Sequence, residues 1–116
     1  MSETVSNRQL RVGESIRRVL IEIMTHDLYD PIFEHSSLTV SEVKMSPDLK
    51  TATAYVLPLI GTNTDRNQLL MHLQDLAPKL RYLVSNKIEL RSSPEIKFKL
   101  DTSFDQAAKI DALLKL

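Results

Sequence analysis

Apolar residues near the start of the chain recur at steps of three and four, which is the spacing of one helix face. This stripe predicts a helix over residues 8–27, and its members are Leu10, Val12, Ile16, Val19, Leu20 and Ile23. Asp30 precedes Pro31, and a residue before proline is disfavoured in the helical conformation. We therefore expect the helix to end before a turn at residues 29–33.

Two segments rich in valine, threonine and alanine then predict a β-hairpin over residues 38–45 and 51–59. Between them stands Ser46-Pro47-Asp48-Leu49, whose proline and aspartate favour a turn. The second strand alternates regularly, but the apolar positions of the first change phase after Ser41. That change predicts a β-bulge, because an extra residue shifts the pairing of the side chains that follow.

A leucine-rich stripe keeps helical spacing from Leu69 to Val84 but is interrupted by Pro78. Proline inside a helix costs about 3 kcal/mol, whereas at the first position of a helix it costs almost nothing. We therefore predict two helices that meet at a structural kink formed by Ala77 and Pro78. The second of these helices is expected to end near Lys87.

A third strand is expected within residues 90–101, where it is entered through Pro94 and lies at an edge of the sheet. Its apolar residues should point inward, and these are Ile96, Phe98 and Leu100. Lys97 and Lys99 should point outward. The chain then predicts a last helix, for which Ser103 is a suitable N-cap.

The predicted fold class is therefore α+β, with a three-stranded sheet covered by helices on one face. The order of elements is α-β-β-α-kink-α-β plus a C-terminal helix, which apart from that last helix is the order of a type II KH-like domain. The expected organisation is a flexible N-terminus over residues 1–7 and a KH-like domain over residues 8–101. The C-terminal helix, residues 102–116, is expected to pack on or beside that domain.

The chain has 116 residues, of which 42% are apolar, and this suits one compact domain. It has no cysteine, which excludes disulfides and thiolate metal sites. No apolar run approaches the roughly 20 residues that span a bilayer, and the polar start lacks a secretory pattern. We expect a soluble, cytoplasmic protein with no membrane partner.

Fifteen basic residues balance fifteen acidic residues, so any nucleic-acid binding must come from local charge. Between Pro78 and Lys99, six basic residues stand against Glu89 and Glu95, which leaves an excess of four. These candidate RNA-binding residues are Lys79, Arg81, Lys87, Arg91, Lys97 and Lys99. Basic side chains on exposed elements often serve only solvation, and that alternative stays open here.

Arg11 and Arg18 are further candidates for RNA contact, because they share one flank of the first predicted helix. Glu14 and Glu22 are close enough along the same helix to form ion pairs with them. Ion pairing and RNA contact are therefore equal alternatives for these two arginines.

Other chemistry has little support. The three histidines lack metal-ligand spacing, the two glycines cannot build a phosphate-binding loop, and no serine has a nucleophile motif. We expect no metal, no cofactor, no small-molecule substrate and no enzymatic activity. Tyr55, Tyr82 and Phe98 form no obvious stacking surface, so RNA recognition should depend on backbone and shape.

Several short segments occur in a characteristic order over nearly the whole predicted domain. They are Arg11-Val12 with Glu14, Asp30-Pro31, Thr39 to Leu49, Ala52 to Val56, Leu80-Arg81, Leu90-Arg91, Pro94 to Phe98, and Asp101. In the identity and order of these segments, the chain resembles the bacterial ribosome-binding factor A family. Members of that family are KH-like, with an alanine-centred kink between two consecutive helices. Where that family has Ala-x-Gly, this chain has Ala77-Pro78-Lys79, so proline keeps the kink and the glycine is absent.

The resemblance implies a non-catalytic factor that binds the free small ribosomal subunit during late maturation of 16S RNA and is linked to growth in the cold. The first hypothesis is accordingly a monomeric KH-like assembly factor whose activity is binding itself. The alternative is a small α+β adaptor that binds a protein through a strand edge or its last helix. Salt-sensitive binding would favour the first hypothesis, and salt-insensitive binding the second.

Overall fold

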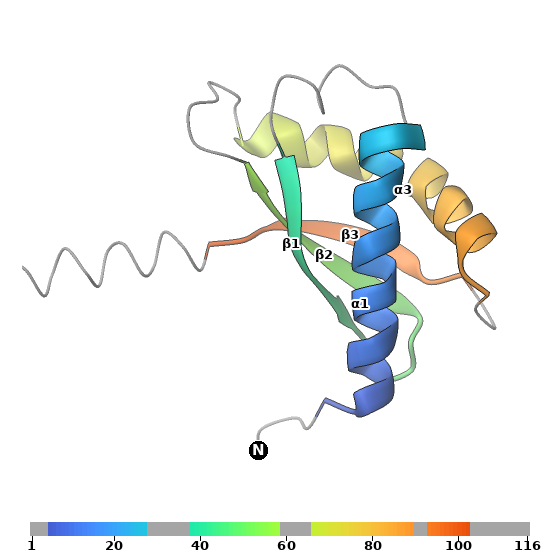
Figure 1. Cartoon of the computed structure of the whole chain (residues 1–116). Coiled ribbons are helices and arrows are strands. Elements are labelled where there is room, and N and C mark those ends of the chain that lie inside the picture. The colour runs from blue at the N-terminus through green and yellow to red at the C-terminus, as the bar shows by residue number, and fades with distance from the viewer. Residues whose placement is uncertain (1–4, 28–37, 59–65, 90–92, 103–116) are drawn as a thin grey trace, which may run out of the picture.

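The structure, a computed structural model, describes residues 5–27, 38–58, 66–89 and 93–102. Its elements are α1 (Asn7–Glu22), the π-helix η1 (Ile23–Asp27), β1 (Leu38–Met45), β2 (Thr51–Pro58), α3 (Arg66–Lys87) and β3 (Glu95–Leu100). The strands lie in the order β1-β2-β3, and β2 is antiparallel to β1 and parallel to β3. Figure 1 shows α1 lying across this sheet. The predicted turn at residues 29–33, Arg91 and the last helix from Ser103 lie outside the described residues.

The start of α1 is fixed by a capping box. The Ser6 hydroxyl accepts the backbone N–H of Gln9 at 3.1 Å, and the Gln9 side chain accepts the N–H of Ser6 at 2.9 Å. Ile16 and Leu20 are fully buried, as the apolar stripe predicts. The same prediction is wrong for Leu10, which is 58% exposed, because Gln9 is the residue that faces the sheet there.

α1 packs directly against the backbone of β1. A Cβ atom on Gly13 would lie only 2.5 Å from the carbonyl oxygen of Val43, so this approach requires glycine. One turn before it, the Gln9 amide donates to a β1 carbonyl at 3.1 Å. One turn after it, Arg17 donates to the carbonyl of Val40 at 3.4 Å. Three residues of α1, spaced four apart, therefore lie against three carbonyl groups of β1.

The predicted hairpin and its bulge are confirmed. The turn closes with a hydrogen bond from the N–H of Leu49 to the carbonyl of Ser46 at 2.9 Å, and Leu49 has a positive φ of 61°. The pairing register shifts between Val40 and Glu42, which places the bulge at Ser41. The Ser41 hydroxyl donates to the Asp101 carboxylate at 2.5 Å and so ties the bulge to the chain after β3.

The sheet buries one face and exposes the other. Its buried residues are Val40, Val43, Met45, Ala52, Ala54, Val56, Ile96 and Phe98. They form one core with the buried side chains of α1 and α3. The expected inward orientation of the β3 residues is confirmed for Ile96 and Phe98, while Leu100 is half-buried.

α3 differs from the prediction of two helices, because it continues through Pro78 as one helix. Proline removes one backbone hydrogen bond and crowds the carbonyl of Gln74, which bends a helix without always ending it. Pro78 and Gln74 are both exposed, so the interruption lies on the solvent side of α3. Figure 1 shows the yellow first half and the orange last half of α3 running in different directions.

Gln74 also forms hydrogen bonds with backbone groups on the outer edge of β3. Its amide nitrogen donates to the carbonyl of Ile96 at 3.5 Å, and its amide oxygen accepts the N–H of Phe98 at 3.3 Å. An edge strand otherwise offers these groups to another chain. Farther along α3, Arg81 donates to the carbonyl of Ser93 at 2.7 Å, which holds the segment that leads into β3.

Candidate nucleic-acid interface

No described helix covers the exposed face of the sheet, here termed the open sheet face. Its outward residues are Glu42, Lys44, Thr51, Thr53, Tyr55, Glu95, Lys97 and Lys99. Asp101, just after β3, continues this alternation, and its carboxylate accepts a hydrogen bond from the exposed Ser41 hydroxyl. The strand register places the outward residues in rows across the sheet: Lys44 lies beside Thr53 and Thr53 beside Lys97. In the next row, Tyr55 lies between Glu42 and Lys99. Lysines on β1 and β3 therefore flank the polar and aromatic side chains of β2.

The charged residues of the open sheet face are three lysines against Glu42, Glu95 and Asp101, which leaves no net charge. Lys97 and Lys99 are exposed, and neither makes an ion pair within the part of the chain that the structure describes. The ammonium nitrogen of Lys44 lies 5.4 Å from the centroid of the Tyr55 ring, which is a cation–π distance. Both lysines of β3 are thus available to an anionic partner.

A cleft of about 440 Å³ adjoins the open sheet face where β1 passes the start of α1. Its lining includes Glu42, Lys44, Thr53 and Tyr55 of the open sheet face. It also includes Val5 and Leu10, which are 51% and 58% exposed. The volume falls in the range of about 300–1,000 Å³ that is usual for small-ligand sites.

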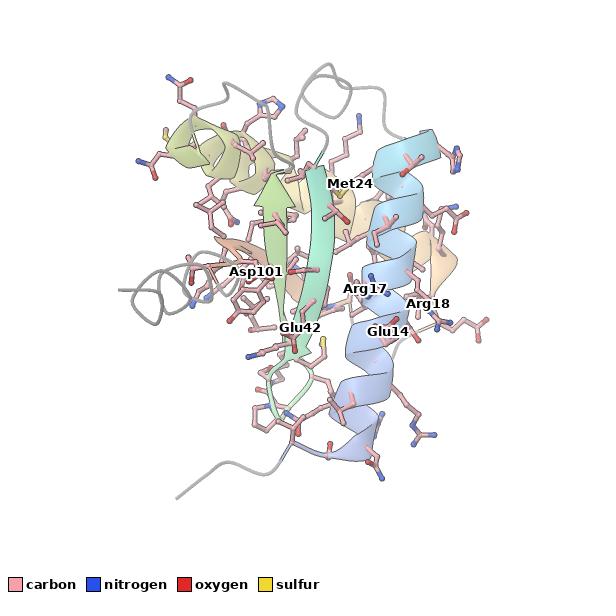
Figure 2. The ribbon with its side chains drawn as sticks, turned by 60° about the vertical axis from the view of Figure 1, so that its left-hand side comes forward. Glu14, Arg17, Arg18, Met24, Glu42 and Asp101 are labelled. Carbon is pink, nitrogen blue, oxygen red and sulfur yellow. The ribbon has the colours of Figure 1, made fainter. Side chains whose placement is uncertain are left out.

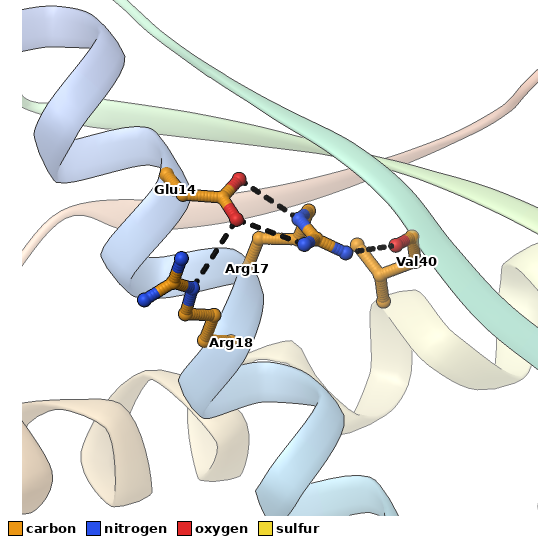
Figure 3. Close-up of polar contacts among 4 residues, drawn as sticks. All are labelled: Glu14, Arg17, Arg18 and Val40. Atoms are coloured by element: carbon orange, nitrogen blue, oxygen red, sulfur yellow. Dashed lines mark hydrogen bonds and ion pairs between the residues drawn. The ribbon is translucent and has the colours of Figure 1, made fainter.

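The two candidate arginines of α1 differ in their contacts. Arg18 donates to the Glu14 carboxylate at 3.3 Å, so it is an ion-pair residue (Figure 3). Arg11 is exposed and makes no ion pair among the described residues. The main partner of Glu14 is Arg17, which holds both carboxylate oxygens at 2.8 and 2.9 Å. Figure 2 shows Arg17 directed from α1 toward β1 and Arg18 on the other flank of the helix.

The Glu14 cluster has a measurable electrostatic consequence. The hydrogen bonds from Arg17, with a smaller contribution from Arg18, lower the pKa of Glu14 from 4.5 to about 2. The ionised carboxylate therefore stabilises the fold above its unfolded pKa, and this contribution is lost as the pH falls toward 2.

We expect the substitution Glu14→Gln to destabilise the protein at neutral pH and to have a shrinking effect as the solution is acidified from about pH 4.5 toward pH 2. Urea unfolding of both proteins across this range measures the difference. Glu89→Gln is the matched control, because Glu89 is exposed and has no ion pair among the described residues. A destabilisation by Glu14→Gln that is the same at every pH would contradict the expectation.

The basic residues predicted on and after α3 do not share one surface. Lys97 and Lys99 lie on the open sheet face, whereas Lys79 and Arg81 are exposed on α3. Arg81 is bound to a backbone carbonyl, as described above. Lys87 forms an ion pair with Glu22 of α1 at 3.2 Å. Within the described residues, Lys79 is exposed and makes no ion pair.

Sequence reasoning did not select Lys44, and it found no stacking surface around Tyr55. Phe98 is buried, so it is excluded as a stacking residue. The missed signal was the period-two alternation of β1 and β2, which directs Lys44 and Tyr55 to the same face as Lys99 once the strands pair.

Within the described ranges, no group of three His, Asp or Glu side chains has the arrangement to hold a metal ion. In the same ranges, no helix is both long enough and apolar enough to cross a membrane.

Helices on one face of a mixed β1-β2-β3 sheet define a KH-like α+β domain. The model of the ribosome-binding factor A family matches residues 8–114. A ribosome-binding factor A of Rhodopseudomonas palustris is 42% identical over 95% of this chain and 80% of its own length. One from Paracoccus denitrificans is 48% identical over 87% of this chain and 72% of its own length. The chain belongs to the ribosome-binding factor A family.

Solved structures agree on the fold. The crystal structure of ribosome-binding factor A from Thermus thermophilus superposes with a TM-score of 0.66 at 20% identity, covering 79% of this chain and 94% of that one. A homology model of the Thermus thermophilus factor, fitted into a cryo-EM map of its 30S complex, gives a TM-score of 0.60 at 22% identity. That comparison covers 78% of this chain and 91% of the other.

Proposed function

We propose that this protein binds the free small ribosomal subunit through 16S RNA and assists the late maturation of that RNA, including during growth in the cold. The observation that carries the proposal is the family match over residues 8–114. The Thermus thermophilus relative fitted into a 30S complex supports the choice of partner. Binding is itself the activity, because a factor that prefers one conformation of the subunit raises the population of that conformation. In this proposal the protein acts in the cytoplasm as a monomer without a cofactor.

We assign the principal RNA contacts to Lys97 and Lys99. Both side chains are exposed, lie two residues apart on one strand face, and have no carboxylate partner in the described structure. A lysine that neutralises a phosphate releases counterions, so binding through these residues should weaken as salt is raised. Lys79 and Arg11, also exposed and without an ion pair in the described ranges, are assigned peripheral contacts.

The remaining candidates have smaller roles in the proposal. Three of them already contact groups of their own chain, namely Arg18, Lys87 and Arg81. Breaking those contacts would reduce the free energy gained from a new contact with RNA. Arg91 lies outside the described residues and is kept as a candidate on its sequence position alone.

We expect the double variant Lys97→Glu/Lys99→Glu to bind free small subunits roughly tenfold more weakly than the wild type, because two phosphate contacts become repulsive. Co-sedimentation with small subunits, large subunits and joined ribosomes at several salt concentrations measures this. The wild type should bind free small subunits selectively and lose affinity as salt rises.

A second double variant, Lys79→Glu/Arg81→Glu, changes the net charge equally but on the surface of α3. Comparing the two variants shows which surface meets the subunit. If the wild type binds no small subunit, the proposed function is wrong. If binding is retained in full by Lys97→Glu/Lys99→Glu and lost by the α3 variant, the assignment to the open sheet face is wrong.

A further inference from the structure

The cleft beside the open sheet face combines the groups that recognise a nucleotide. Tyr55 supplies an aromatic ring, and Lys44 supplies a cation next to it. The exposed side chains of Val5 and Leu10 add apolar surface to the lining, which also includes Glu42. A flat, partly apolar base and an anionic phosphate match this combination.

The face of the Tyr55 ring carries the cation of Lys44. The Lys44 ammonium group lies over it at 5.4 Å, on a long and exposed side chain. A cation–π contact at an exposed site is weaker than the stacking of a base on an aromatic ring. A base can therefore displace Lys44 from the ring, and the released ammonium group can bind the phosphate of the same nucleotide.

The charge of the open sheet face limits the length of RNA that it binds. Three lysines stand there against Glu42, Glu95 and Asp101, so only a few phosphates can be neutralised. A long duplex presents a continuous line of phosphates and buries its bases, and neither feature suits this surface. The row from Tyr55 to Lys99 leads from the cleft across the sheet to β3.

We propose that the cleft and the open sheet face bind a short unpaired segment of RNA, with one base stacked on Tyr55 and adjacent phosphates on Lys44, Lys97 and Lys99. This inference rests on the proposed function, because it specifies the form of RNA that the same lysines bind. Recognition then includes a stacked base and is more than the reading of backbone and shape that the sequence predicts.

The first test compares a labelled unpaired hexanucleotide with a duplex of the same sequence by fluorescence anisotropy. Tyr55→Val keeps a residue that favours strands and should bind the unpaired RNA about tenfold more weakly, as expected for one lost stacking contact. Tyr55→Phe keeps the ring and should bind like the wild type. Tyr82→Val is the matched control, since Tyr82 is 65% exposed on α3 and should not affect binding. The duplex should bind more weakly than the unpaired RNA.

The second test uses the fact that the chain has no tryptophan. A Tyr55→Trp variant places a single indole in the cleft, and its fluorescence should be quenched as the hexanucleotide stacks on it. The logarithm of the binding constant should fall with the logarithm of salt concentration with a slope of about −2, which is three phosphates at about 0.7 each.

The outcomes separate this inference from the proposed function. Wild-type affinity of Tyr55→Val for the unpaired RNA, or an unchanged Tyr55→Trp signal at saturating RNA, would overturn the stacking proposal. If the stacking proposal fails but Lys97→Glu/Lys99→Glu still weakens binding to the small subunit, the proposed function stands without the stacked base. Tighter binding of the duplex than of the unpaired RNA would also contradict the inference.

Discussion

A Gly13→Val substitution should lower the free energy of unfolding by roughly 3 kcal/mol, near the upper end of the usual cost of overpacking. The reason is the 2.5 Å distance between the Val43 carbonyl oxygen and the position of a Cβ on Gly13. That oxygen is a backbone atom of β1, so it cannot move aside as a flexible side chain would. Urea unfolding followed by circular dichroism measures the loss.

Two further variants separate the clash from helix propensity. Ser15→Val places the same side chain at an exposed position of α1 and should change stability by less than about 0.5 kcal/mol. Gly13→Ala adds the same Cβ atom but also gains up to about 1 kcal/mol of helix propensity. A clear stabilisation by Gly13→Ala would show that α1 can move away from β1, and the expectation for valine would then fail.

Leu80→Ala should destabilise the protein by about 3 kcal/mol, which is within the range for deleting a large buried side chain. Leu80 is fully buried although it lies only two residues after Pro78. The bend in α3 must therefore keep the last half of the helix packed on the core. Removing the side chain would leave a cavity there, which thermal or urea unfolding would detect.

Met71→Ala on the same helix is the control for Leu80→Ala. It removes a side chain of similar size, but Met71 is 69% exposed and the change should cost less than about 0.5 kcal/mol. Equal effects of the two substitutions would mean that the last half of α3 contributes little to the core.

The elements with regular apolar spacing could be predicted from the sequence. Period-two alternation gave the two hairpin strands and the inward orientation of Ile96 and Phe98, and its change of phase located the bulge at Ser41. The path of α3 through Pro78 could not be predicted. It depends on whether the carbonyl freed by the proline reaches solvent, and only tertiary packing decides that.

The candidate interface was harder to predict, because it depends on contacts between distant segments. Lys97 and Lys99 were found from one strand alone, but their neighbours Lys44 and Tyr55 become visible only when the strand register is known. Ser6 and Gln9 do show a capping-box spacing in the sequence. Nothing in that spacing indicates that Gln9 also bonds to β1.

The glutamine contacts at the two rims of the sheet affect how the molecule meets its neighbours. Gln9 binds a carbonyl of β1, and Gln74 mimics a peptide group beside β3. With these hydrogen bonds made internally, sheet extension from one copy to the next is disfavoured even when the protein is concentrated. Contact with another molecule is then left to the side chains of the surface.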